Sequence, residues 1–77
     1  MEKIDHNKII KIISETIREP IEKIDMESKA SDFVYWDSLS QVTMMLKIEK
    51  IIKKKINTSK ILELDSVKKI ISFLESV

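Results

Sequence analysis

The hydrophobic residues of this chain follow a helical period in separate stretches. In residues 5–18 isoleucine recurs every four positions, which predicts an amphipathic helix. The repeated positions are Ile9, Ile13 and Ile17. Asp5 is suited to cap the start of this helix. The helix must end before Pro20, because the residue that precedes a proline avoids the α region.

Residues 38–53 form the second periodic stretch, in which apolar residues recur at positions i, i+3 and i+7 with one polar interruption. The stripe is Leu39, Val42, Met45, Leu46, Ile48, Glu49 and Ile52. We expect Met45 to belong to the core. Three lysines, residues 53–55, follow the stripe, where positive charge complements the helix dipole. The stretch therefore predicts a second long helix.

Two shorter helices are predicted near the C-terminal end. Asn57 and Thr58 are suitable caps for a single helical turn over residues 59–63. Asp65 is expected to cap a last helix with apolar residues at i, i+3, i+4 and i+7. Those residues are Val67, Ile70, Ile71 and Leu74.

Residues 19–37 show no sustained period and predict a long connection. Long loops inside compact domains are uncommon unless they serve a function. We expect Ile24 and Phe33 to anchor this loop to the helices. The fold class is then all-α: a small four-helix bundle with a long loop between the first two helices, a short third helix, and one domain over residues 1–77.

Composition narrows the function classes. The chain has 77 residues and no cysteine or glycine, so a disulfide framework and a cysteine-based metal site are excluded. Apolar runs of at most four residues predict no membrane span, and the first residues lack the apolar region of a secretion signal. We expect a cytoplasmic monomer, with His6 on its surface and no metal.

Charge is distributed unevenly. Residues 1–37 contain six Lys/Arg and nine Asp/Glu, whereas residues 38–77 contain eight and four. The asymmetry could steer a partner or could simply belong to solvated faces. The lysines at 53–55 could contact nucleic acid, but no aromatic residue lies among them and the net charge is only +1. We therefore expect no nucleic-acid partner.

The chemically informative segment is residues 35–39, Tyr-Trp-Asp-Ser-Leu. Ser38 lies at the first turn of the second long helix, where unpaired N–H groups and a partial positive charge favour a phosphate ester. Asp37 can cap the helix and hold the Ser38 hydroxyl outward. No His or Lys lies within a few residues to activate that hydroxyl, so if Ser38 reacts, another protein should do the activating.

A structural interpretation of the same residues stays open. Ser38 and Gln41 match a capping box, in which Ser38 would only cap the helix and Gln41 would reciprocate. Trp36 beside a helix start is also explained by packing alone. Met44 could pack in the core or line a channel for an acyl group.

Asp37-Ser38-Leu39 resembles the attachment motif of acyl carrier proteins, and the order and length of the predicted helices match that family over the whole chain. The resemblance implies that Ser38 carries 4′-phosphopantetheine, transferred from coenzyme A by a phosphopantetheinyl transferase. The thiol of that arm would carry acyl groups as thioesters to acyl-loading and acyl-transferring enzymes. Asp37 would be the family's aspartate, and Leu39 would pack beneath the site and help present it.

Two features depart from the family pattern. Tyr35-Trp36 stands where the fatty-acid branch has Gly-Ala, and Trp-Asp-Ser-Leu resembles carriers of specialised pathways, such as polyketide-like or surface-glycan acylation systems. The family's second helix is usually acidic, whereas this one is rich in lysine, which suggests a dedicated partner. The expected docking residues are Trp36, Val42, Thr43, Met44, Lys47, Glu49 and Lys50.

Alternative functions remain. An aminoacyl or peptidyl carrier would use the same arm and differ only in its loading enzyme. A small helical interaction module would need no prosthetic group, and the lysine run alone favours a nucleic-acid binder. An autonomous enzyme is disfavoured, because the sequence has no metal cluster, no triad near Ser38 and no glycine-rich phosphate loop.

Overall fold

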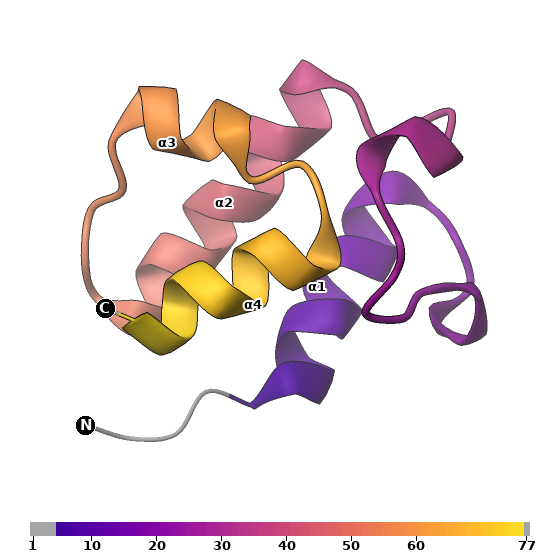
Figure 1. The fold of residues 1–77 in the computed structure, drawn as a ribbon, viewed down its shortest axis with the longest axis horizontal. Helices are drawn as coiled ribbons and strands as arrows, with labels where there is room; N and C mark the ends of the chain where they lie inside the picture. The colour runs from indigo at the N-terminus through magenta and orange to yellow at the C-terminus, as the bar shows by residue number, and fades with distance from the viewer. Residues whose placement is uncertain (1–4, 77) are drawn as a thin grey trace.

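The computed structural model describes residues 5–76, and this part of the chain is all-α (Figure 1). The elements are α1 (His6–Ile17), η1 (Ile21–Lys23), η2 (Ala30–Asp32), α2 (Ser38–Ile52), α3 (Thr58–Glu63) and α4 (Val67–Ser76), where η marks a short 3-10 helix. The four predicted helices are confirmed, with bounds within a residue or two of those expected. None of the helices in residues 5–76 is long and apolar enough to cross a bilayer.

The first and last helices form for the reason the pattern predicted. Each has one apolar stripe, and that stripe faces the core. Asp5 caps α1 as expected: its carboxylate accepts the N–H groups of Asn7 and Lys8 at 3.0 and 3.4 Å. His6 is exposed, as predicted, and its Nε2 lies 3.0 Å from Glu75 Oε2, which joins the start of α1 to the end of α4.

α2 differs from the predicted stripe. Its buried face consists of Gln41, Met44, Met45 and Ile48. Leu39 and Leu46, which the spacing assigned to the core, are 77% and 49% exposed. Apolar side chains lie on several sides of this helix, so periodicity alone does not identify the buried face. The packing of α1 and α3 against α2 makes that choice.

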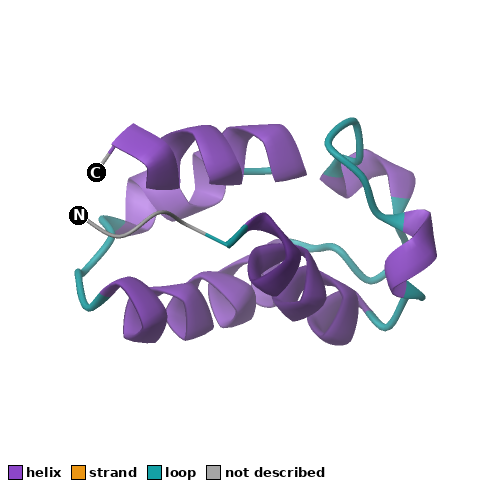
Figure 2. Ribbon diagram, turned by 90° about the horizontal axis from the view of Figure 1, so that it is seen from below, coloured by secondary structure: helices purple, strands orange, loops and turns teal. Residues whose placement is uncertain are grey.

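One hydrophobic core joins the four helices and the long loop. Figures 1 and 2 show α4 on the opposite side of the molecule from α2, with α1 crossing at one end. The side chains between them are almost wholly enclosed. The core residues are Ile9, Ile13, Ile17, Ile24, Trp36, Met44, Met45, Ile48, Ile56, Ile61, Leu64, Val67, Ile70, Ile71 and Leu74. Met45 is therefore a core residue, as predicted.

The long loop between α1 and α2 is held in place by backbone hydrogen bonds to the segment that begins α4. Ala30 N–H donates to the Asp65 carbonyl at 2.8 Å, and Val67 N–H donates to the Ser28 carbonyl at 3.0 Å. This pair of bonds fastens the loop to the start of α4. Ile24 is buried and Phe33 is partly buried against the core, so both predicted anchors are confirmed. The two 3-10 turns in this loop were not predicted.

The caps of the two C-terminal helices confirm one prediction and correct another. The Asn57 side chain accepts the Ser59 N–H at 2.8 Å and caps α3, as expected. Asp65 does not cap α4. The Ser66 hydroxyl takes that role by accepting the Lys69 N–H at 3.1 Å, while Asp65 forms an ion pair with the Lys69 ammonium. Both residue types are good caps, and the bond from the loop to the Asp65 carbonyl places Ser66 at the helix start.

The two long helices end in the left-handed region without glycine. Arg18 follows α1 with φ of 59°, and Lys53 follows α2 with φ of 57°. A side chain in this region crowds the following carbonyl, which costs about 1–2 kcal/mol for a residue other than glycine. The glycine-free composition therefore leaves strain at both helix ends.

Replacing Lys53 with glycine should stabilise the domain. Glycine adopts the left-handed region without strain, but it also raises the conformational entropy of the unfolded chain, which opposes folding. The relief of strain is the larger effect, so the free energy of unfolding should rise by about 0.5–1 kcal/mol. Urea denaturation measures it. Lys54→Gly is the matched control, because Lys54 is equally exposed but has no positive φ, and it should give no gain. Equal stability of Lys53→Gly and the parent chain would contradict the interpretation.

Candidate functional site

Ser38 is the first residue of α2, and its side chain is exposed. Among residues 5–76 its hydroxyl has no hydrogen-bond partner that holds it against the protein. The N-cap is the preceding residue, Asp37, whose Oδ1 accepts the Ser40 N–H at 2.9 Å. The capping-box interpretation of Ser38 is therefore wrong, and its hydroxyl is free at the positive end of the α2 dipole.

The Asp37 carboxylate is held in its charged form. Its hydrogen bond from the Ser40 backbone N–H lowers the pKa of this carboxyl below its ordinary value. A negative charge at a helix N-terminus is also favoured by the dipole. The prediction that Asp37 caps the helix while Ser38 stays exposed is confirmed.

A buried set of hydrogen bonds lies directly beneath this helix start. Trp36 Nε1–H donates to Gln41 Oε1 at 2.6 Å. The Gln41 amide nitrogen in turn donates to the Ile61 carbonyl at 2.8 Å and to the Leu64 carbonyl. Trp36 and Gln41 are each only 4% exposed. One side chain thus joins the loop before α2 to α3 and the residue that follows it.

Sequence reasoning did not identify Gln41 in this role. The spacing from Ser38 suggested a reciprocal cap, and glutamine is seldom buried. A signal was present, because Gln41 lies three and four residues before Met44 and Met45 and seven before Ile48. That spacing places a polar residue on the same face as three apolar ones. A polar residue on such a face needs a buried partner, and Trp36 supplies one.

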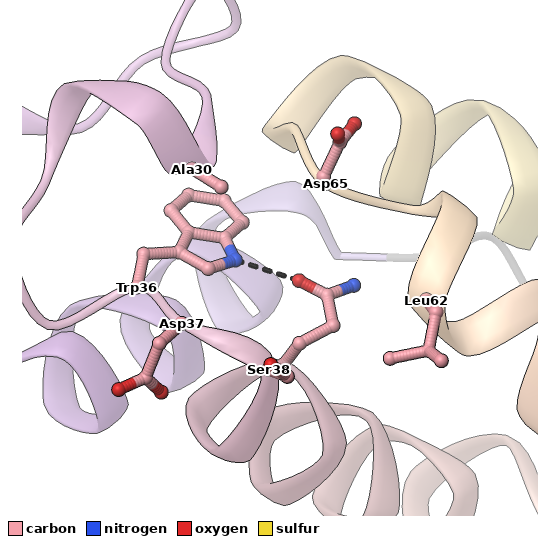
Figure 3. A pocket seen from close by; sticks show the side chains of 7 residues that line it. Ala30, Trp36, Asp37, Ser38, Leu62 and Asp65 are labelled. Atoms are coloured by element: carbon pink, nitrogen blue, oxygen red, sulfur yellow. Dashed lines mark hydrogen bonds between the residues drawn. The ribbon is translucent and has the colours of Figure 1, made fainter.

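A cavity of about 230 Å³ opens beside Ser38 (Figure 3). Ala30 of η2 and the Trp36 ring lie on one side of it, and Leu62 of α3 lies on the other. The lining residues are Ala30, Trp36, Asp37, Ser38, Gln41, Leu62 and Asp65. The cavity therefore combines apolar walls with a polar base at the level of Gln41.

Exposed apolar side chains occur close to the serine in sequence and across the cavity from it. Leu39 follows it, Val34 precedes it in the loop at 88% exposed, and Leu62 lies across the cavity. The expectation that Leu39 packs beneath the site is wrong. The buried face of α2 is centred on Gln41 and Ile48, and residue 39 lies on the opposite side of the helix.

The predicted docking residues do not form one surface. Thr43, Lys47 and Lys50 are exposed and Val42 is partly exposed. Trp36 and Met44 are buried, so neither side chain presents a surface to a partner, because each lies on the core side of the backbone. The burial of Met44 also answers its open assignment in favour of core packing.

Glu49 is not a free acidic group on this face. Its Oε2 accepts the Ile56 N–H at 2.6 Å, so the carboxylate fastens the segment after α2 to the helix. Lys53, Lys54 and Lys55 are exposed beyond the same helix end. Among residues 5–76, the ion pairs do not include Lys47, Lys50 or these three lysines. The outer face of α2 is therefore apolar near Ser38 and positively charged towards its C-terminal end.

Comparisons of the chain with protein-family models, with curated proteins and with solved structures found no match.

Stability should depend on the ionisation of Asp37. Its pKa is lower in the folded chain than in the unfolded one, so the stabilisation is present above the ordinary carboxyl pKa of about 3.9. It is lost as the pH falls through the folded-state pKa. Asn at position 37 also caps a helix but does not titrate.

The prediction is that the parent chain loses more stability than Asp37→Asn on acidification from about pH 5 to pH 2. Urea denaturation at a series of pH values measures the difference. An identical pH profile for the two proteins would show that the Asp37 charge has no part in holding the start of α2.

Proposed function

We propose that this chain is an acyl carrier protein that bears 4′-phosphopantetheine on Ser38. The observation that carries the proposal is the exposed Ser38 hydroxyl at the start of α2, left free because Asp37 is the cap. The four-helix order, with a long ordered loop before α2 and a short α3, supports an acyl-carrier type of fold.

The residues around Ser38 fit such a group. A phosphodiester on this oxygen lies at a helix N-terminus, where backbone N–H groups and the dipole favour negative charge. When bound, the arm supplies a terminal thiol that forms thioesters, which this cysteine-free chain cannot provide. Asp37 keeps the first turn in place, and the exposed position of Ser38 gives a modifying enzyme access to it.

The protein itself does no bond chemistry in this proposal. A phosphopantetheinyl transferase activates Ser38, and acyl-loading and acyl-transferring enzymes act on the arm. The cargo class includes acyl groups of fatty-acid, polyketide-like or other specialised pathways. An aminoacyl or peptidyl cargo would use the same Ser38 chemistry.

Mass spectrometry tests the attachment. The protein co-expressed with a phosphopantetheinyl transferase should gain the mass of one phosphopantetheine unit, and Ser38→Ala should abolish the gain. Ser59→Ala is the matched control, because Ser59 is also an exposed serine in the first turn of a helix. It should leave the gain intact. Absence of any gain in the parent chain would instead favour an interaction module without a prosthetic group.

The partners of this carrier are proposed to have an acidic docking surface. The outer face of α2 presents Lys47 and Lys50, and the Glu49 carboxylate is engaged by the Ile56 N–H. Opposite charge on the partner accelerates encounter, and like charge suppresses it. Enzymes that normally dock an acidic second helix should therefore process this carrier poorly.

Charge reversal tests the partner proposal. Generic fatty-acid-synthase enzymes should load and elongate on the holo protein slowly, and Lys47→Glu/Lys50→Glu should raise the rate at least about tenfold at low salt. Lys68→Glu is the control, since Lys68 is an exposed lysine of α4, away from α2. Normal rates with the parent chain, or no gain from the double substitution, would overturn the acidic-partner proposal.

A further inference from the structure

The cavity beside Ser38 ends at a polar barrier. Gln41 is 4% exposed, and its amide uses both donors and its oxygen in hydrogen bonds to Ile61, Leu64 and Trp36. These bonds join α2 to α3 one turn beyond the serine. An alkyl chain that passed from the cavity into the core between α2 and α3 would have to break these bonds.

Behind this barrier the interior is filled. The next residues on the buried face of α2, Met44, Met45 and Ile48, are fully enclosed, and so are Val67 and Ile70 of α4. An alkyl chain that entered there would displace close-packed side chains. It would also leave the Trp36 N–H and the Gln41 amide buried without partners, which is costly.

The cavity itself is small. Its volume of about 230 Å³ lies below the 300–1,000 Å³ typical of pockets that enclose a small-molecule ligand. Asp37, Gln41 and Asp65 give it polar edges beside the apolar Trp36 and Leu62. This lining suits the segment of an arm nearest to Ser38 or a short group, because a long alkyl chain in the cavity would lie against the polar groups of Asp37, Gln41 and Asp65.

Resting on the proposed function, we propose that this carrier holds short or polar acyl groups outside the bundle, and that Gln41 is the residue that excludes an alkyl chain from the core. Long alkyl groups gain from burial, whereas short or polar ones remain compatible with water. The cargo class is thus set by the hydrogen bonds between α2 and α3.

Thermal unfolding of loaded protein tests this inference. A phosphopantetheinyl transferase with acetyl- or octanoyl-coenzyme A places either group on Ser38 of the full chain. In the parent protein the two forms should melt within about 2 °C of each other, because no extra apolar area is buried. Methyl NMR signals of Met44 and Ile48 should also be the same in the two forms. A melting temperature more than about 5 °C higher for the octanoyl form would overturn the proposal.

Variants test the role of Gln41. Trp36→Phe/Gln41→Leu removes both partners of the Trp36–Gln41 bond and leaves no unpaired side-chain donor. The Ile61 carbonyl keeps the Leu64 N–H, and the Leu64 carbonyl loses the Gln41 amide, so urea denaturation first confirms that the variant is folded. In this variant the octanoyl form should melt at least about 5 °C above the acetyl form. Thr43→Leu, which adds an apolar side chain to the exposed side of α2, should behave as the parent chain does. No difference between the two loaded forms of the double variant would overturn the role of Gln41.

The inference and the proposed function fail in different ways. If neither group can be attached to Ser38, the carrier function is wrong. If both attach and the octanoyl group stabilises the parent chain, the carrier function stands and the exclusion of alkyl chains is wrong.

Discussion

The buried amide of Gln41 is the interaction on which the arrangement of the site depends. It satisfies the Trp36 indole, which comes from the loop, and two carbonyls at the C-terminal end of α3. α3 has only six residues and would be marginal as an isolated helix. Three partners held by one side chain fix the distance between α2 and α3, and thereby the width of the cavity beside Ser38. A polar network in a small core imposes one geometry, because any other leaves buried groups unpaired.

The loop before α2 completes that arrangement. It could move freely if its ends alone held it, but two backbone bonds fasten it to the start of α4. Phe33 stacks on Trp36 with ring centroids 6.2 Å apart, which helps to hold the indole against Gln41. Arg18, at the end of α1, lies 5.7 Å above the Tyr35 ring. The segment that leads to Ser38 is therefore held on both sides, and the serine is presented on an ordered support.

The division of α2 into two faces links the fold to the proposed function. Its inner face makes the core and the polar barrier, while Leu39, Leu46 and the lysines lie outside. The exposed Leu39 beside Ser38 costs the chain little in stability, and in the proposed function it offers contact area to an enzyme that modifies the serine. In this proposal the carrier has few internal interactions with its cargo and relies on its outer surface for recognition.

The amino-acid sequence by itself determined where the helices lie along the chain and that Ser38 stands at the start of α2. The isoleucine spacing of α1 and the stripe of α4 each allow one buried face, so local pattern sufficed, and Ser38 follows the long loop whatever the packing. Tertiary structure decided which face of α2 is buried, because apolar residues occupy several sides of it. It also decided between neighbouring caps, Asp37 over Ser38 and Ser66 over Asp65, which have similar intrinsic preferences. The partners of Gln41 lie up to 23 residues away along the chain, and such contacts exist only once α3 has packed against α2.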